Sequence, residues 1–328
     1  MKRLLALSIV LSLLLLVSCR TGDSDTDVSP VESVTYLLLG LDDAAENTDV
    51  IALLTYHIAQ NRLSLLQIPR DTYYRFSTGQ NKINQLYATN CTKMSKGEAA
   101  AATAREISEL FGVQLVGYVA LTTGGFRTVV DTLGGIDISV PEDMTVYDEY
   151  GENPMFLARG THHLDGRQSE RFVRFRRGYA MGDLGRLDAQ KIFFSALLRR
   201  ARSIRFDEAV TLLARLRKDA LVRGEGLKIT KESFSLLSQL DNCSVSYVTL
   251  PGESITAASG LSYYVLNRRA TMDVLSRYVG ADRMRFDREE RLYKPDDLAF
   301  KNIYFDKNFG YREYTDDTLG SLHIPGAG

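Results

Sequence analysis

The chain of 328 residues lacks the features that assign a function most directly. Its 40 basic and 41 acidic residues give a formal charge of −1, so no global field attracts nucleic acid or an anionic membrane. It contains no G-x-S-x-G nucleophile motif, no phosphate-binding P-loop and no paired CxxC. No repeat of about 20–50 residues is visible, which disfavours a repeat architecture. A site for an anion must therefore come from local clustering of charge.

Cysteine and histidine are also scarce, with three cysteines and four histidines. If Cys19 is modified, as argued below, Cys91 and Cys243 remain, either as a disulfide in an oxidising compartment or as two buried thiols. The sequence leaves both alternatives open. His162 and His163 lie in a predicted loop with no third ligand at a useful spacing, so we interpret them as loop or surface residues rather than metal ligands.

The N-terminus carries the most specific compositional signal. Lys2 and Arg3 precede an apolar run over residues 4–17, which is too short for a comfortable spanning helix and is typical of an export signal. The run ends in Leu-Val-Ser-Cys, which resembles a bacterial lipobox. We therefore predict a lipoprotein signal peptide over 1–19, lipidation of Cys19 and attachment to the extracytoplasmic face of the bacterial cell membrane. The alternatives are an ordinary signal peptide or a short uncleaved anchor. Residues 20–33 are small, polar and acidic and predict a linker.

The rest of the chain interleaves strand-like and helix-like segments. The nearly continuous apolar run at 34–43 predicts a strand buried on both faces, and hence a sheet with helices on both sides. The sequence predicts further strands at 48–58, 62–68, 114–122, 136–141 and 244–251, and helices at 97–112, 124–135, from 187 onward, 206–221, 230–240 and 267–280. This alternation predicts one α/β domain over 34–280, with a loop-rich part at 142–170 and an irregular C-terminal extension at 281–328.

The basic stretch 171–190, RFVRFRRGYAMGDLGRLDAQ, is the first candidate for an anion site. If 171–176 is a strand, Arg174 and Arg176 share a face about 7 Å apart. If Asp183 caps a following helix, Arg186 and Gln190 share a helical face. The end of a strand and the start of a helix together would form a nest of donors suited to phosphate. The alternative is a solvated cluster of charge.

Other charged residues stand just beyond predicted strands, where α/β proteins place their chemistry. Asp42 follows the first strand and Asp49 opens the second, so the two carboxylates either hold Mg²⁺ together with phosphate oxygens or serve as turn and cap residues. Arg70 follows Pro69 at the end of the third strand and offers a fork either to a phosphate or to Asp71.

A series of motifs covers residues 34–205 in a consistent order: GLDD…NTDV (40–50), IPRDT (68–72), NKIN (81–84), GGFRTVVDTLGGIDISVP (124–141), LDG (164–166) and RFRRGYAMGDLGRLDAQ (174–190). This series resembles the LytR-CpsA-Psr family. The resemblance implies an α/β domain whose mixed central sheet is flanked by helices, with a hydrophobic channel for a polyprenyl chain. It also implies Mg²⁺-dependent transfer of a glycopolymer, such as teichoic acid or capsule, from a polyprenyl-pyrophosphate carrier to peptidoglycan.

The resemblance assigns roles to residues by position. It implies that Asp42 and Asp49 hold the metal, and that the pyrophosphate is bound by Arg70, Lys82, Arg174, Arg176, Arg186 and Gln190. Among these, we expect Arg70, Arg174 and Arg176 to carry the catalytic charge stabilisation, and either Asp71 or a metal-bound carboxylate is a candidate general base. The apolar face with Phe193, Phe194 and Leu197 lines either the lipid channel or ordinary core. Two positions depart from the family, which often has arginine near Asn47 and at Ala189; their absence predicts weaker head-group binding or altered substrate choice.

The sequence therefore predicts a phosphotransferase whose partners are a polyprenyl-pyrophosphate-linked glycan, peptidoglycan and, through the lipid anchor, the membrane, with no role for nucleic acid. Two rival functions remain open. One is a pyrophosphatase for polyprenyl diphosphates, in which water replaces the sugar acceptor. The other is a non-catalytic lipoprotein that binds such lipids or wall polymer, which the two missing arginines motivate.

Overall fold

The computed structural model describes residues 33–42, 47–77, 81–148, 151–176, 179, 182–203, 206–224, 243–281 and 289–322. The predicted signal peptide with Cys19, the linker up to residue 32 and the predicted helix at 230–240 lie outside these residues. None of the helices in the described part is long and apolar enough to cross a bilayer.

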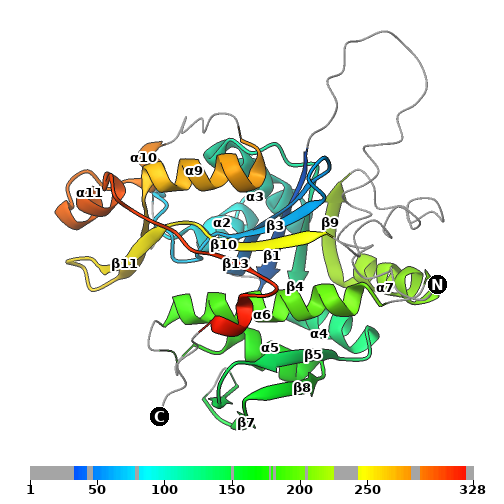
Figure 1. The fold of residues 1–328 in the computed structure, drawn as a ribbon. Helices are drawn as coiled ribbons and strands as arrows, with labels where there is room; N and C mark the ends of the chain where they lie inside the picture. The colour runs from blue at the N-terminus through cyan, green and yellow to red at the C-terminus, as the bar shows by residue number, and fades with distance from the viewer. Residues whose placement is uncertain are drawn as a thin grey trace, which may run out of the picture.

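A mixed seven-stranded sheet forms the centre of the molecule (Figure 1). Its strand order is β13 (Glu313–Thr315), β10 (Ser244–Thr249), β3 (Arg62–Gln67), β2 (Thr48–His57), β1 (Ser33–Leu41), β4 (Gly117–Thr122) and β9 (Ala220–Gly224). The pairs β1–β4 and β3–β10 are parallel and the other four pairs are antiparallel. The predicted mixed sheet is confirmed, and a short turn joins β2 to β3, where Asn61 adopts a φ of 43°.

Helices cover both faces of the sheet, as the buried run of β1 predicts (Figure 1). Val34 and Tyr36 pack in the core on one face and Leu37 and Leu39 in the core on the other. The first core contains α4 (Thr123–Thr132), α5 (Gly166–Arg174), α6 (Asp183–Ala201) and α7 (Phe206–Asp219), and the second contains η2 (Ile83–Gln85), α2 (Leu86–Cys91), α3 (Lys96–Phe111) and α9 (Arg268–Val279). This packing of helices on both faces of the sheet confirms the predicted fold class.

The segment 136–176 differs most from its prediction. β5 (Ile136–Val140) leaves the central sheet and pairs with β8 (Gly160–Leu164), beside a second hairpin of β6 (Met144–Val146) and β7 (Met155–Leu157). The predicted strand at 171–176 is wrong, because α5 runs to Arg174. Asp165 and Gln168 form a capping box that starts this helix, and Phe172 and Val173 turn inward at helical spacing from Ser169.

The predicted irregular C-terminal extension contains ordered elements. They are α10 (Glu289–Leu292), α11 (Leu298–Tyr304), β13 and η4 (Leu319–Ser321), which follow the β11–β12 hairpin (Gly252–Thr256 and Ser262–Leu266) and α9. Phe300 and Tyr304 are fully buried, and β13 adds an edge strand to the central sheet. Cys91 and Cys243 are free thiols, which resolves the alternative left open by the sequence.

Candidate active site

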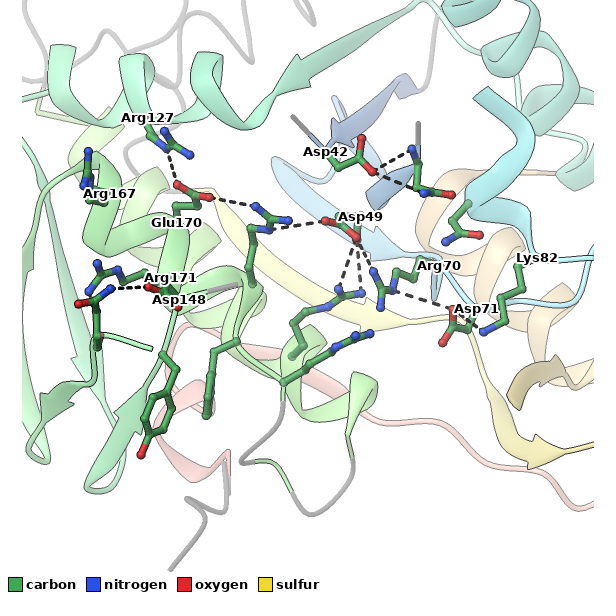
Figure 2. Close-up of a pocket in the computed structure, with 18 residues that line it drawn as sticks. Asp42, Asp49, Arg70, Asp71, Lys82, Arg127, Asp148, Arg167, Glu170 and Arg171 are labelled. Atoms are coloured by element: carbon green, nitrogen blue, oxygen red, sulfur yellow. Dashed lines mark hydrogen bonds and ion pairs between the residues drawn. The ribbon is translucent and has the colours of Figure 1, made fainter. Parts of the chain in front are cut away.

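A polar cavity of about 670 Å³ lies where the ends of β1, β2 and β3 meet α5 and α6 (Figure 2). Eight basic side chains line it against five acidic ones, although the whole chain carries a formal charge of −1. The basic residues are Arg70, Lys82, Arg127, Arg167, Arg171, Arg174, Arg176 and Arg186, and the acidic residues are Asp42, Asp49, Asp71, Asp148 and Glu170. The positive charge that the chain lacks as a whole is therefore concentrated at this cavity.

Asp49 is the centre of the charge cluster. Its Oδ1 atom lies 2.5 Å from Nη1 of Arg70 and 3.7 Å from Nη1 of Arg186, and its Oδ2 atom lies 3.7 Å from Nε of Arg174. Three arginines from three separate elements thus converge on one carboxylate. A phosphate group presents the same kind of oxygen acceptors to such a set of guanidinium forks.

Further carboxylates form ion pairs with these arginines and fix their positions. Asp183, the first residue of α6, accepts from Nη2 of Arg186 at 3.0 Å and lies 3.3 Å from Nε of Arg70. The predicted helix therefore exists, but Gly182 occupies its N-cap and Asp183 its first turn. Asp71 lies 3.1 Å from Nζ of Lys82 and 4.0 Å from Nε of Arg70. The sequence left open whether Arg70 binds a phosphate or pairs with Asp71. In the structure Arg70 forms ion pairs with carboxylates and also lines the cavity, so the two roles are compatible.

The pKa shifts of Arg70 and Arg186 differ in sign. Burial lowers the pKa of Arg70, but the neighbouring carboxylates, led by Asp183 and Asp49, outweigh that effect and raise it. Burial lowers the pKa of Arg186, and the positive charge of Arg70 lowers it further against the opposing carboxylates. Arg186 is 2% exposed, so burial and the neighbouring positive charge both disfavour its charged form. An additional anion in the cavity would favour that form.

The structure adds an ion-paired triad that the sequence reasoning missed. Glu170 on α5 lies 3.0 Å from Nη1 of Arg174, one helical turn later, and also pairs with Nε of Arg127 on α4. The Glu170–Arg174 spacing of four residues was a readable helical signal, hidden by the predicted strand. Arg127 and Glu170 are 43 residues apart, and only tertiary packing brings them together.

Two predicted phosphate ligands occupy different surroundings from the arginine cluster. Arg176 lines the cavity but is exposed, and it has no ion-pair partner among the residues that the structure describes. Gln190 shares the predicted face of α6 with Arg186, yet it does not line the polar cavity. Its amide donates to the carbonyl of Val173 at 3.3 Å and accepts from Gln67 at 3.4 Å.

An apolar cavity of about 220 Å³ adjoins the polar one, between the central sheet, α4 and α6. Phe193, Phe194 and Leu197 line it, as predicted for the channel face, together with strand residues such as Leu38 and Leu54. Asp49, Glu170 and Arg174 line both cavities. The two spaces therefore meet at charged residues, which suits a ligand with an anionic head and an apolar tail.

The two predicted metal ligands both line the polar cavity. One oxygen of Asp42 accepts from the backbone nitrogen of Asn47 at 3.1 Å and from its amide at 3.5 Å. Within the described ranges no group of three or more His, Cys, Asp or Glu side chains is arranged to hold a metal ion. Two carboxylates completed by phosphate oxygens and water are nevertheless a donor set that Mg²⁺ takes.

The chain is similar to known proteins in sequence and in fold. The LytR_cpsA_psr family model matches residues 19–278. A polyisoprenyl-teichoic acid–peptidoglycan teichoic acid transferase, TagU of Bacillus mycoides, is 26% identical over 265 residues, which are 78% of this chain and 81% of that protein. TagV of Bacillus subtilis, which bears the same transferase name, is 29% identical over 177 residues, or 51% of this chain and 43% of that protein.

Solved structures show the same fold. The crystal structure of B. subtilis TagV superposes with a TM-score of 0.61 and 20% identity, covering 77% of this chain and 99% of that one. The structure of TagT bound to LI-WTA gives a TM-score of 0.57 and 23% identity, covering 78% and 95% of the two chains.

Proposed function

The chain belongs to the LytR-CpsA-Psr family, and on that basis we propose that it transfers a glycopolymer from a polyprenyl-pyrophosphate carrier to peptidoglycan. The relatives in this family are named as teichoic acid transferases that act on peptidoglycan. The observation that carries the proposal is the junction of the polar and apolar cavities at Asp49, Glu170 and Arg174. The charged pyrophosphate of such a carrier fits the polar cavity, and its hydrocarbon chain fits the adjoining apolar cavity.

The arginine cluster would act by positioning and by charge stabilisation, which dominate in phosphoryl transfer. Arg70, Arg174 and Arg186 present guanidinium groups from three elements to the pyrophosphate. A hydroxyl group of the acceptor sugar attacks the phosphorus that bears the glycan. The new P–O bond forms as the bond to the bridging oxygen breaks, and polyprenyl monophosphate leaves with that oxygen. The arginines stabilise the negative charge that develops on it.

The proton of the attacking hydroxyl needs an acceptor, and Asp71 is our candidate. It lines the polar cavity beside Lys82 and Arg70, so its carboxylate is held in place next to the pyrophosphate ligands. Replacement of Asp71 by Asn keeps the size of the side chain and removes its basicity. We expect that change to lower the rate of transfer more than the affinity for the carrier.

Mg²⁺ is the cofactor that we propose for the site. Asp42 and Asp49 would hold it from the rim of the sheet, with phosphate oxygens and water as the other ligands. When bound, the ion would neutralise charge on the pyrophosphate. Asp49 would share its carboxylate between the ion and the three arginines that contact it.

One incubation separates the proposal from its rivals. Purified protein is mixed with a polyprenyl-diphosphate saccharide, Mg²⁺ and a peptidoglycan acceptor, and the products are separated by mass. Glycan covalently joined to the acceptor supports transfer. Release of a saccharide phosphate without joining would support a pyrophosphatase in its place. Binding without turnover, with the relative TagU active in parallel, would support a non-catalytic lipid-binding lipoprotein.

We further propose that lipidation of Cys19 holds the protein on the extracytoplasmic face of the membrane. The proposal rests on the apolar run before Cys19 and the polar linker after it. Expression of the chain with Cys19→Ala should move it from the membrane fraction to the soluble one. Mass spectrometry of the wild-type N-terminal peptide should show a diacylglyceryl-modified cysteine, and an unmodified Cys19 would refute this anchor.

A further inference from the structure

Glu170 occupies a distinctive position at the junction of the two cavities. It is one of three residues that line both, and it is 9% exposed. Its two carboxylate oxygens bind two different arginines, with Oε1 3.0 Å from Nη1 of Arg174 and Oε2 paired with Nε of Arg127. Figure 2 shows Glu170 and Arg127 on one side of Asp49, and Arg70, Asp71 and Lys82 on the other.

The backbone is shaped to allow this bridge. Arg127 lies on α4 and Glu170 on α5, and the two helices approach closely at Gly166, the first residue of α5. A Cβ atom added at Gly166 would lie 2.6 Å from the carbonyl oxygen of Arg127, nearer than real contacts allow. The backbone nitrogen of Gly166 also donates to Asp131 of α4 at 2.7 Å. A glycine at this point therefore brings Glu170 within reach of Arg127.

The two cavities also indicate the direction in which the substrate lies in the site. Arg174 lines both cavities, whereas Arg70, Lys82 and Arg186 line the polar one alone. Arg127 also lines only the polar cavity, but its ion pair with Glu170 ties it to the junction. A tail in the apolar cavity places the phosphate esterified to the lipid at the junction, nearest Arg174. The phosphate that bears the glycan then extends toward Arg70 and Lys82.

We propose, on the basis of the proposed function, that Glu170 is a positioning residue that aims Arg174 and Arg127 at the lipid-side phosphate. A guanidinium has five N–H donors in a rigid plane, so a bond from one nitrogen to a fixed carboxylate sets the direction of the others. Arg174 receives this constraint from Glu170 at one end and from Asp49 at the other. The inference adds Arg127 to the phosphate ligands and divides the cavity into a lipid-side and a glycan-side subsite.

Binding of two probes to Glu170→Gln tests the inference. Gln keeps the size of the side chain but cannot bridge two cations as a carboxylate does. We expect farnesyl monophosphate, which must place its phosphate at the junction, to bind about tenfold more weakly, the effect of losing one charged hydrogen bond. Inorganic pyrophosphate can occupy the glycan-side subsite, so its affinity should change by less than about threefold. Isothermal titration calorimetry measures both affinities.

Two further variants separate positioning from a loss of structure. Glu106→Gln removes a half-buried carboxylate that binds Tyr74 and lies 4.0 Å from Arg291. Glu106 lines neither cavity, so neither affinity should change. Arg127→Met should weaken farnesyl monophosphate binding. Its effect and that of Glu170→Gln should combine less than additively, because each disrupts the same pair.

The outcomes distinguish the inference from the proposed function. If the wild-type protein binds neither farnesyl monophosphate nor farnesyl diphosphate, the proposed function fails. If the wild-type protein binds them, and Glu170→Gln binds farnesyl monophosphate and inorganic pyrophosphate as tightly as the wild type does, the positioning role is refuted. An equal loss for both probes would also overturn it, because Glu170 would then support the whole cluster rather than the lipid-side subsite.

Discussion

Removal of the Asp49 charge is the most informative single perturbation of this site. Asp49→Asn keeps the side-chain shape but removes the negative charge on which Arg70, Arg174 and Arg186 converge. Breaking a buried ion pair by removing one partner costs about 3–5 kcal/mol. The Asp49 side chain is 17% exposed, and Asp183 remains beside two of the arginines. We therefore expect the free energy of unfolding to fall by about 2–3 kcal/mol, below the fully buried case.

The same variant should bind anions better. In the wild type a phosphate must compete with Asp49 for the arginines, whereas in Asp49→Asn it replaces the missing charge. At about 100 times its dissociation constant, a ligand adds about 2.7 kcal/mol to the free energy of unfolding, which is enough to offset the loss. Inorganic pyrophosphate should therefore raise the Tm of Asp49→Asn more than that of wild type at equal concentration.

Thermal melting without Mg²⁺ measures both effects while keeping the proposed metal role of Asp49 out of the comparison. At about 2 °C per kcal/mol for a domain of this size, Asp49→Asn should melt about 5 °C lower than wild type. Asp137→Asn is the matched control, because its carboxylate is 70% exposed and pairs with His163 away from the cavity. Its Tm should stay within about 1 °C, since exposed pairs contribute little. The reasoning would be refuted if Asp49→Asn had an unchanged Tm and pyrophosphate raised the Tm of both proteins equally, because Asp49 would then not compete with an anion for the three arginines.

Four further predictions follow from particular side chains. Arg174→Ala and Arg176→Ala should each lose transfer activity in the peptidoglycan assay with circular dichroism unchanged, and unfolding of both would point to a structural role. Burial lowers the pKa of His57 below 6.5, so the unfolded chain binds the proton more tightly than the folded chain does. The free energy of unfolding should therefore fall as the pH drops below 6.5. In urea titrations, His57→Gln should reduce this dependence on pH. Val129→Phe should fill part of the apolar cavity and weaken farnesyl diphosphate but not inorganic pyrophosphate in calorimetry. Asn47→Arg adds a cation to the polar cavity and should tighten pyrophosphate binding several-fold, with a change in stability of about 0.5 kcal/mol or less in the same urea titrations.

The elements that the sequence predicted correctly carry their signals locally. The buried run of β1 and the apolar strands β2 and β3 follow directly from composition. Gly112 ends α3 in the left-handed region with a φ of 61°, as its position in the sequence predicts. The sequence therefore predicts the charged residues that flank those strands at one edge of the sheet.

The errors came from competition between local patterns and from contacts distant in the sequence. Arginines at alternate positions in 171–176 suggested a strand, but the Asp165 capping box and the inward spacing of Ser169, Phe172 and Val173 favour a helix. That error concealed Glu170, whose partner Arg174 is a neighbour only on a helix. β13 pairs with β10 across more than sixty residues, a contact that no local period could have predicted.

The two departures from the family pattern, at Asn47 and Ala189, have different physical consequences. Asn47 lines the polar cavity, and both its backbone and its amide donate to Asp42, so its identity directly affects the charge that a ligand meets. Ala189 lies on α6, is fully buried in the core and lines neither cavity. An arginine there would have to carry its charge out of a close-packed core, which costs free energy unless a partner is provided. The missing cation that bears on head-group affinity is therefore the one at Asn47, because an arginine there would add its charge at the cavity itself.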